Sequence, residues 1–544
     1  MIESKWQRIM YTDKTRGDWM RKFNVTGTCV PEEHYMVDIS EKLKQIKKMI
    51  DEKEYFTINR GRQYGKTTTL ASLEHYLKDE YIVISLSFEG LGESVFFTEE
   101  KFCREFMKLI KEALELSGYS SEEQAKWENE SVDDFMSLSR HIREICRYSN
   151  MQYVLMIDEV DKASNNVVFL NFLSKLREQY LARRVKKGFT FHSVILAGVY
   201  DIRTLKLKLI QEGLHTPAGQ ETTTQNSPWN IAASFKVDMS FSVLEIETML
   251  NDYEQEHQSG MDIFAIANEI HIYTNGYPVL VSTICKYIDE ELEKKWDVLG
   301  VRRAVRLIIN EDIPLFQNLV KNLNGNQDLS NMIYDVLISG TGWRFTFADP
   351  IIVLGYRYGY FIDSDNRVKV SNKIFEVIMS DYFVNQAQRD IFRLTPSKDE
   401  LITSIVVDGK FNMQVCLERF AKYYHKHYSE KDVEFIEREA RFFFLFFLNS
   451  VVNGRGFVHT ESGFTDESRM DVIVNYRDQQ FIVELKIWHG PKRHEDAYKQ
   501  LLGYMDKMCL DEGYLLTFDF RKKKTQQQEW VEIEGDRKIF DVIV

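Results

Sequence analysis

The stretch YFTINRGRQYGKTTTL at residues 55–70 constrains the fold of this chain more than any other. A β-rich run, Tyr55–Ile58, leads into a glycine-bearing loop, and a helical pattern follows through Lys78. A strand, a loop ending in Gly-Lys-Thr and a helix follow each other in this order in phosphate-binding loops. The N–H groups of such a loop and the positive end of the helix dipole point at one anion. The stretch therefore predicts a nucleotide-binding unit.

Two side chains of this loop have predicted roles. Lys66 is expected to reach the β- and γ-phosphates, and the Thr67 hydroxyl is expected to hold Mg²⁺. The usual G-x-x-x-x-G-K-[ST] spacing would place glycine at position 60, but Arg60 stands there and Gly61 comes one place late. The alternative interpretation is an ordinary strand-to-helix turn.

A second stretch, YVLMIDEVD at residues 153–161, supports the nucleotide site. Carboxylates that follow a buried strand are costly unless they serve a site. We expect Asp158 to hold Mg²⁺ and Glu159 to polarise the attacking water. A helix cap after a strand is the alternative. The predicted nucleotide-binding residues are Arg60, Gly61, Arg62, Gln63, Tyr64, Gly65, Lys66, Thr67, Thr68 and Asp158, with Thr67 and Asp158 as the metal ligands.

Further strands are predicted at Tyr81–Phe88 and Ser193–Val199, and Asp201 after the second is a candidate sensor of the γ-phosphate. Arg183 and Arg184 end the helix that precedes the second strand. One of them could act as an arginine finger toward a neighbouring subunit of a homo-oligomer. We favour the alternative, a basic helix C-terminus that complements the helix dipole.

The N-terminal part ends in an amphipathic helix with Ile39, Leu43, Ile46 and Ile50 at helical spacing. Before it, Cys29 and His34 form a weak candidate metal pair, and a loop packing near the adenine is favoured because no second pair lies nearby.

Composition limits the remaining classes. The six cysteines of the 544-residue chain are scattered, which fits a reducing cytosol. The N-terminus lacks an apolar signal region, and the longest apolar run, Phe442–Val452, is too short for a membrane span. We therefore expect a cytoplasmic protein without a membrane partner. Because the net charge is −13, any contact with nucleic acid must use local basic patches.

A second constellation lies near the C-terminus. Two strands, Arg469–Val474 and Gln480–Ile487, are predicted to form a hairpin that carries Asp471, Glu484 and Lys486. Residues two apart in a strand share a face, so Glu484 and Lys486 project together and Asp471 can meet them from the neighbouring strand. The two carboxylates, with the Leu485 carbonyl as a possible third ligand, suit Mg²⁺ or Mn²⁺, and the lysine can activate water. A surface hairpin with a salt bridge is the alternative.

The quoted stretches HYMVDI, NRGRQYGKTTTL, YVLMIDEVD, SVILAGVYDIRTLK and SPWNIA occur in an order that resembles the bacterial AAA-like ATPases fused to a C-terminal PD-(D/E)XK nuclease-like domain. In that family a basic residue stands where this chain has Arg60, so the spacing is shared. D-x(n)-E-x-K is the nuclease signature, here with Met470 in place of the usual proline, and Gln500 and Tyr504 resemble the Q-x-x-x-Y motif of RecB-type nucleases.

The resemblance implies an α/β protein with several parts. They are an N-terminal segment (1–50), an AAA-type P-loop ATPase core (51–230), a helical lid (231–310), a winged-helix-like module (311–390) and a PD-(D/E)XK nuclease-like α/β domain (400–544). It also implies that Glu437 is a further metal-facing carboxylate, favoured over Glu439, that Glu461 is a candidate outer acid, and that Gln500 and Tyr504 belong to the catalytic set. Lys492, Arg493 and 521–524 would hold phosphates or form an ordinary solvated face.

The expected function is therefore ATP binding and hydrolysis coupled to Mg²⁺- or Mn²⁺-dependent cleavage of nucleic acid, with DNA favoured, in defence or control of mobile elements. The rival is an ATP-switched nucleic-acid-binding or signalling protein whose nuclease-like domain is not catalytic.

Overall fold

The computed structural model describes residues 21–129, 131–163, 166–199, 229–339, 342–391, 404–427, 443–445, 447–449, 451–452, 456–462, 470–488, 490–521, 527–533 and 537–544. They fall into two compact units. The first comprises the described residues up to Ile263 with Gly276–Lys286, and the second comprises Phe264–Asn275 with the described residues from Tyr287 onward. The candidate sensor Asp201 and the predicted metal ligand Glu437 lie outside the described residues, as does Glu439.

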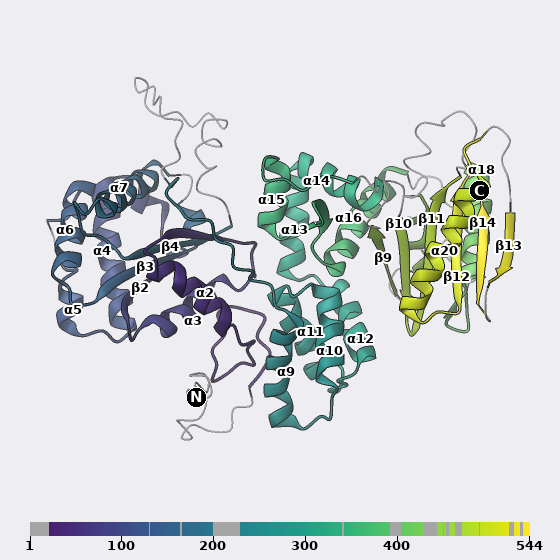
Figure 1. Ribbon diagram of the computed structural model, residues 1–544, viewed down its shortest axis with the longest axis horizontal. Coiled ribbons are helices and arrows are strands. Elements are labelled where there is room, and N and C mark those ends of the chain that lie inside the picture. Colours follow the sequence, from purple (N-terminus) through teal and green to yellow (C-terminus); the bar gives the residue numbers. More distant parts are fainter. Residues whose placement is uncertain are drawn as a thin grey trace. The chain divides into compact units, whose positions relative to one another are not determined.

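The first unit is built on a parallel four-stranded sheet in the order β1-β4-β3-β2 (Figure 1). Its strands are β1 (Tyr55–Asn59), β2 (Tyr81–Ser87), β3 (Gln152–Asp158) and β4 (Ser193–Gly198). These runs are almost wholly apolar because both faces of the sheet are covered, as in other parallel sheets. The strands predicted from the apolar runs are thus confirmed within one or two residues.

Helices cover the two faces of this sheet. One face packs on α4 (Glu99–Leu116), α6 (Phe135–Tyr148) and α7 (Val167–Arg184) around a phenylalanine-rich core. The other carries α3 (Lys66–Leu77), which packs against α2 (Ser40–Asp51). The apolar side chains of α2 predicted from helical spacing, Leu43, Ile46 and Ile50, are fully buried. The unit also contains η1 (Glu93–Phe96), α5 (Ser121–Ala125), η2 (Val160–Lys162), α9 (Val243–His257) and the first turns of α11 (Pro278–Glu290).

The second unit begins with helices and a small hairpin. The helices are α10 (Ile263–Thr274), α12 (Val298–Ile309), α13 (Pro314–Gly325), α14 (Gln327–Tyr334), the π-helical η3 (Asp335–Ser339), α15 (Pro350–Tyr358) and α16 (Lys373–Ile391). Strands β5 (Phe361–Ser364) and β6 (Arg367–Val370) pair antiparallel as a short hairpin. They are followed by β7 (Val406–Val407), β8 (Lys410–Phe411) and α18 (Met413–His427).

The C-terminal part of this unit is a six-stranded sheet in the order β13-β14-β12-β11-β10-β9. Its strands are β9 (Gly456–Ser462), β10 (Met470–Tyr476), β11 (Gln479–Ile487), β12 (Glu512–Phe518), β13 (Gln527–Glu532) and β14 (Lys538–Ile543). Strands β9 to β11 form an antiparallel meander, whereas β11, β12 and β14 are parallel. The hairpin predicted from Arg469–Val474 and Gln480–Ile487 is confirmed as β10 and β11, whereas β13 and β14 were not predicted.

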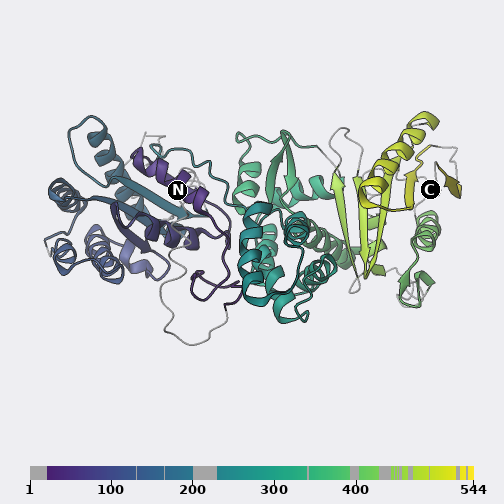
Figure 2. The ribbon, with the colours of Figure 1, turned by 60° about the horizontal axis from the view of Figure 1, so that its bottom comes forward.

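Helices pack against this sheet, and Figure 2 shows them beside its strands at the C-terminal end of the chain. Helix α20 (Pro491–Met508) packs Ala497, Leu501 and Met505 against Ile482 and Leu515. Helix α18 contacts the opposite face, where the ring of Phe420 lies 6.2 Å from that of Phe518. Successive side chains along β11 and β12 therefore point alternately toward α20 and toward the other face of the sheet, where α18 packs. Within the described part of the chain, no helix combines the length and the apolarity needed to cross a bilayer.

Candidate functional site

The loop between β1 and α3 folds around the Lys66 ammonium group. Helix α3 begins at Lys66, whose side chain is only 5% exposed. Its Nζ donates to the carbonyl oxygens of Arg60 at 3.1 Å and Gly61 at 3.0 Å. Burial lowers the pKa of Lys66, against the opposing effect of Glu159, Asp158 and Asp161. An ammonium group held in this way is positioned to exchange carbonyl oxygens for phosphate oxygens.

The missing glycine at position 60 has a structural explanation. The positions of the loop with left-handed backbone are Gln63, with φ of 57°, and Gly65, with φ of 75°, and Arg60 is not among them. The Arg60 N–H instead donates to Gly198 O at 3.1 Å, which extends the pairing of β1 with β4. Because position 60 needs no positive φ, arginine fits there as well as glycine would.

The end of β3 meets this loop. Thr67 Oγ1 donates to Asp158 Oδ2 at 2.6 Å, and Asp158 Oδ1 accepts the Glu159 N–H at 2.8 Å. A buried carboxylate beside a threonine hydroxyl is the oxygen donor set that Mg²⁺ uses with substrate phosphates. The two residues therefore fit the magnesium ligands expected from the sequence.

Glu159 follows Asp158 in a strained conformation. Its φ of 52° is left-handed, which is uncommon for a residue with a side chain and is found at functional sites. Burial raises the pKa of Glu159, and the charges of Asp158 and Asp161 add to this while Lys66 opposes it. A carboxylate with a raised pKa is a better proton acceptor near neutral pH.

Asp161, to which the sequence assigned no role, fixes the turn after Glu159. Its Oδ2 accepts the Val199 N–H at 2.6 Å, just beyond the end of β4. The contact is close: a Cβ on Gly198 would lie 2.9 Å from Asp161 Oδ1, so a larger residue at position 198 would have to displace this carboxylate. This carboxylate joins the turn that carries Glu159 to the neighbouring strand end. The only sign of this role in the sequence was the position of Asp161 at the end of the acidic stretch YVLMIDEVD.

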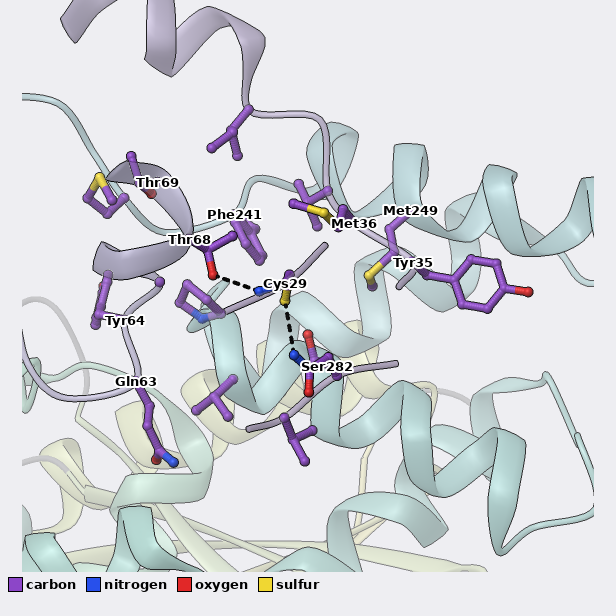
Figure 3. A pocket seen from close by; sticks show the side chains of 18 of the residues that line it. Cys29, Tyr35, Met36, Gln63, Tyr64, Thr68, Thr69, Phe241, Met249 and Ser282 are labelled. Atoms are coloured by element: carbon purple, nitrogen blue, oxygen red, sulfur yellow. Dashed lines mark hydrogen bonds between the residues drawn. The ribbon is translucent and has the colours of Figure 1, made fainter. Parts of the chain in front are cut away.

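A cavity of about 150 Å³ opens beside the loop (Figure 3). Apolar side chains from the 24–39 segment and from α9 and α11 form much of its wall, and Gln63, Tyr64, Gly65, Thr68 and Thr69 form the loop side. The Cys29 N–H donates to Thr68 Oγ1 at 3.2 Å, so the 24–39 segment is attached directly to α3. The segment thus lines a cavity next to the phosphate loop, and that it packs near the adenine stays a prediction.

Cys29 and His34, the candidate metal pair, form hydrogen bonds with residues of their own segment. His34 Nδ1 accepts the Val30 N–H at 2.9 Å, and Cys29 Sγ accepts from Asn24 Nδ2 at 3.7 Å. In the described parts of the chain, no group of three or more His, Cys, Asp or Glu side chains could hold a metal. All six cysteines are described and are free thiols.

Arg183 has a structural role within this unit. Its guanidinium donates to Lys53 O at 2.7 Å and to His192 O at 2.6 Å, and lies 5.2 Å from the ring centre of Tyr55. These contacts favour the basic helix end over an arginine finger at this position. Arg184 is more exposed and lies 4.0 Å from Glu54.

The C-terminal sheet brings together three of the residues predicted there. Asp471 of β10 is paired in register with Glu484 of β11. Glu484 is fully buried and forms an ion pair with Lys486. Lys486 Nζ also donates at 3.1 Å to Gln500 Oε1 on α20. Glu484, Lys486 and Gln500 therefore lie in contact with one another, and that they form a catalytic centre stays a prediction.

Glu484 has the environment expected of a cation ligand. Apart from the ion pair with Lys486, neither of its carboxylate oxygens accepts a hydrogen bond from the described residues. The Lys486 ammonium group neutralises the buried charge, whereas Oε2 has no donor among the described residues, a costly state that a bound cation would relieve. Glu484 therefore fits a Mg²⁺ or Mn²⁺ ligand, with Asp471 opposite it in the sheet. Glu461 pairs in register with Asp471 on the other side, and Tyr504 packs against the apolar cluster under α20.

A second polar cluster lies under α20 and was not predicted. Asp541 of β14 is fully buried, and its Oδ2 lies 2.7 Å from both His494 Nε2 and Tyr498 Oη. Thr517 Oγ1 lies 3.4 Å from His494 Nδ1. These contacts fix the first turns of α20 on the sheet. The only signal in the sequence was a charged residue inside the apolar run KIFDVIV.

The parallel sheet, the loop around Lys66 and the acidic end of β3 together define an α/β protein with a P-loop ATPase core. The chain belongs to the AAA-like domain family, whose family model matches residues 38–376, more than half of the sequence. No curated protein matches it.

Several solved structures are similar in part. A Walker-type ATPase of Pyrococcus abyssi shares 11% identity with a TM-score of 0.45 over 66% of this chain and 99% of its own. The ORC2 protein of Aeropyrum pernix in its ADP form shares 11% identity with a TM-score of 0.35 over 67% of this chain and 98% of its own. The ORC1 protein of the same organism in complex with DNA shares 11% identity with a TM-score of 0.27 over 65% of this chain and 94% of its own.

Proposed function

We propose that this protein binds and hydrolyses ATP at the loop around Lys66. The observation that carries the proposal is the 2.6 Å hydrogen bond between Thr67 and Asp158, which joins the loop and the acidic strand end into one site. Neither the loop nor the acidic strand end alone would support an ATPase, since short Gly-Lys-Thr sequences and acidic strand ends are both common.

Each residue has a task that follows from its position. Lys66 binds the β- and γ-phosphates with the N–H groups of Gly65–Thr68, and Thr67 and Asp158 hold Mg²⁺. The ion, when bound, neutralises charge on the phosphates. Glu159 accepts a proton from the attacking water, for which its raised pKa suits it. The adenine is assigned to the cavity lined by the 24–39 segment.

The test compares wild type with Glu159→Gln, which keeps the shape of the side chain but cannot accept the proton. ATP affinity measured by titration calorimetry should stay unchanged, and phosphate release should fall by at least about 100-fold. Glu112→Gln, at an exposed position of α4, is the matched control. Normal turnover in Glu159→Gln would assign the base elsewhere.

We further propose a Mg²⁺- or Mn²⁺-dependent nuclease centre in the C-terminal sheet, of the PD-(D/E)XK type. The observation that favours it is the chain of contacts from buried Glu484 to Lys486 and from Lys486 to Gln500. In this centre Asp471 and Glu484 hold the metal, which supplies hydroxide and polarises the phosphate. Lys486 orients the water, Gln500 orients Lys486, and Tyr504 and Glu437 complete the set. Nucleic acid, with DNA favoured, is the substrate.

The decisive experiment incubates wild type and Glu484→Gln with plasmid, linear and single-stranded DNA and RNA, with and without ATP, Mg²⁺ and Mn²⁺. Cleavage by wild type alone supports the proposal, and Glu495→Gln on the exposed face of α20 should cleave normally. No cleavage by wild type would favour an ATP-switched binding protein.

We also assign the helices and hairpin of residues 311–390 as a winged-helix-like module and residues 231–310 as the lid.

A further inference from the structure

Trp488 continues the row of side chains that forms the C-terminal centre. It lies two residues beyond Lys486, so its Cα is about 7 Å further along the strand direction. The backbone N–H of Trp488 donates to Phe518 O at 2.9 Å, which continues the pairing with β12 one residue past the end of β11. The indole lies on the α20 side, with its ring 5.0 Å from that of His494. Glu484, Lys486 and Trp488 thus follow one another on a single face.

Arg521 is fixed over this indole. Its Nε and Nη2 bind Asp519 Oδ1 and Oδ2 at 2.9 Å and 2.7 Å, so the contact is bidentate. Asp519 is almost fully buried, whereas the Arg521 side chain is 49% exposed. The guanidinium carbon lies 4.9 Å from the Trp488 ring centre. One edge of the guanidinium is therefore held by the protein while the side chain remains accessible to solvent.

A fixed guanidinium group beside the proposed metal-binding strand face suits a phosphate ligand. Planar guanidinium groups recognise phosphate well, and the side chain of Arg521 is 49% exposed beside its contact with Asp519. Because the side chain is already ordered, binding loses less conformational entropy than it would at a flexible lysine. Lys492 and Arg493 are exposed on the first turn of α20, beside His494, and add positive charge to the same strand ends.

We propose that Arg521, stacked on Trp488, binds the phosphate backbone of a nucleic-acid strand and guides it to the Glu484–Lys486–Gln500 centre. This inference rests on the proposed nuclease function and names how its substrate is held. Phosphates of DNA and RNA share the required chemistry. The alternative role of Arg521, which is only to neutralise buried Asp519, predicts no effect on nucleic-acid binding.

The experiment measures binding of 5′-labelled single-stranded DNA and RNA to the full chain by fluorescence anisotropy, with EDTA present so that no cleavage occurs. Affinity is measured over a range of salt concentrations. Each phosphate contact contributes about 0.7 to the slope of log K against log salt for single strands. Arg521→Ala should therefore weaken binding several-fold and reduce the slope by about 0.7.

Arg537→Ala is the matched control, because Arg537 is ion-paired with Asp506 and precedes β14, at the opposite ends of the parallel strands. It should leave affinity and slope unchanged. Arg521→Ala removes the guanidinium group from buried Asp519, so the double variant Asp519→Asn with Arg521→Gln is measured in parallel, and it should lose the same slope.

An unchanged slope in a folded variant, or an equal loss in Arg537→Ala, would overturn the inference, as would a wild type that binds neither strand. Binding that depends on Arg521 without any cleavage in Mn²⁺ would instead overturn only the nuclease assignment. Comparison of the two labelled strands shows which nucleic acid supplies the phosphates.

Discussion

Two lysines, one in each unit, are held near carboxylates in opposite ways. The Nζ of Lys66 is bound by two backbone carbonyls of its own loop, from residues five and six positions earlier. The Nζ of Lys486 is bound by side chains, Glu484 on the same strand and Gln500 on a helix 14 residues later. The first lysine is set by local backbone geometry, and the second by the packing of a helix on a sheet.

The difference has a consequence for function. A lysine held by carbonyls can leave them for phosphate without stranding a charge, because carbonyls are neutral. A lysine paired with a buried carboxylate is bound to a charge that it cannot leave unless a cation replaces it. We therefore expect Lys66 to contact its substrate directly, and Lys486 to act together with a metal.

The largest expected effect on ligand affinity follows from removal of the first lysine. Lys66→Ala should weaken ATP binding by at least about 30-fold, since loss of one partner of a buried charged contact costs about 2 kcal/mol or more. Titration calorimetry measures the affinity, and Lys78→Ala at the exposed end of the same helix is the control. Undiminished affinity would show that the loop does not bind the phosphates.

Removal of the second lysine should separate catalysis from metal binding. Lys486→Gln should slow nucleic-acid cleavage about 100-fold, because the water loses the group that orients it. Mn²⁺ affinity, measured by calorimetry, should persist because Asp471 and Glu484 remain. Lys499→Gln, at an exposed position of α20, should change neither quantity. Loss of Mn²⁺ binding together with cleavage would contradict the assigned role.

Asp161 tests whether the nucleotide site depends on contacts beyond its local loop. Asp161→Ala should reduce ATP turnover about 10-fold with little change in KM, because the turn that carries Glu159 loses its attachment to Val199. Asp161→Asn keeps an acceptor oxygen and should retain most of the turnover. Steady-state kinetics distinguish the two variants, and equal losses in both would argue against a positioning role.

The same pair of variants gives a pH signature. Glu159 acts as the base only when deprotonated, and burial raises its pKa, so turnover should fall on acidification at a higher pH than for an ordinary glutamate. The Asp161 charge contributes to this rise. Its removal in Asp161→Asn should therefore lower the pKa and move the acidic limb of the pH–rate profile to lower pH. A limb that stays in place would indicate another base.

The smallest expected effect concerns the helix that completes the second site. Gln500→Ala removes one hydrogen bond to Lys486 and should slow cleavage about 3- to 10-fold, the range of a single hydrogen bond. Gln528→Ala on β13 is the control. An effect as large as that of Lys486→Gln would mean that Gln500 contacts the substrate or metal itself.

Most of the nucleotide core could be predicted because its signals are local. Apolar runs identified β2, β3 and β4, and the loop between β1 and α3 is continuous in sequence. That Asp471 and Glu484 lie on one face was also predictable, since alternation along adjacent strands fixes which residues share a face, but their direct pairing in register was not. The winged-helix-like and nuclease-like assignments rest on resemblance and stay predictions.

The sequence by itself determined which residues form the phosphate loop and the acidic strand end, because strand, loop and helix follow each other without interruption. Only the tertiary structure decided that Asp161 joins two strand ends and that Asp541 belongs inside a buried strand. The carboxylate of Asp541 in the run KIFDVIV predicts, by itself, that this run is exposed. The strand is buried because His494 and Tyr498 of α20 bind that carboxylate. Such partners come from distant positions, and a buried charge is tolerated only where the packed chain supplies them.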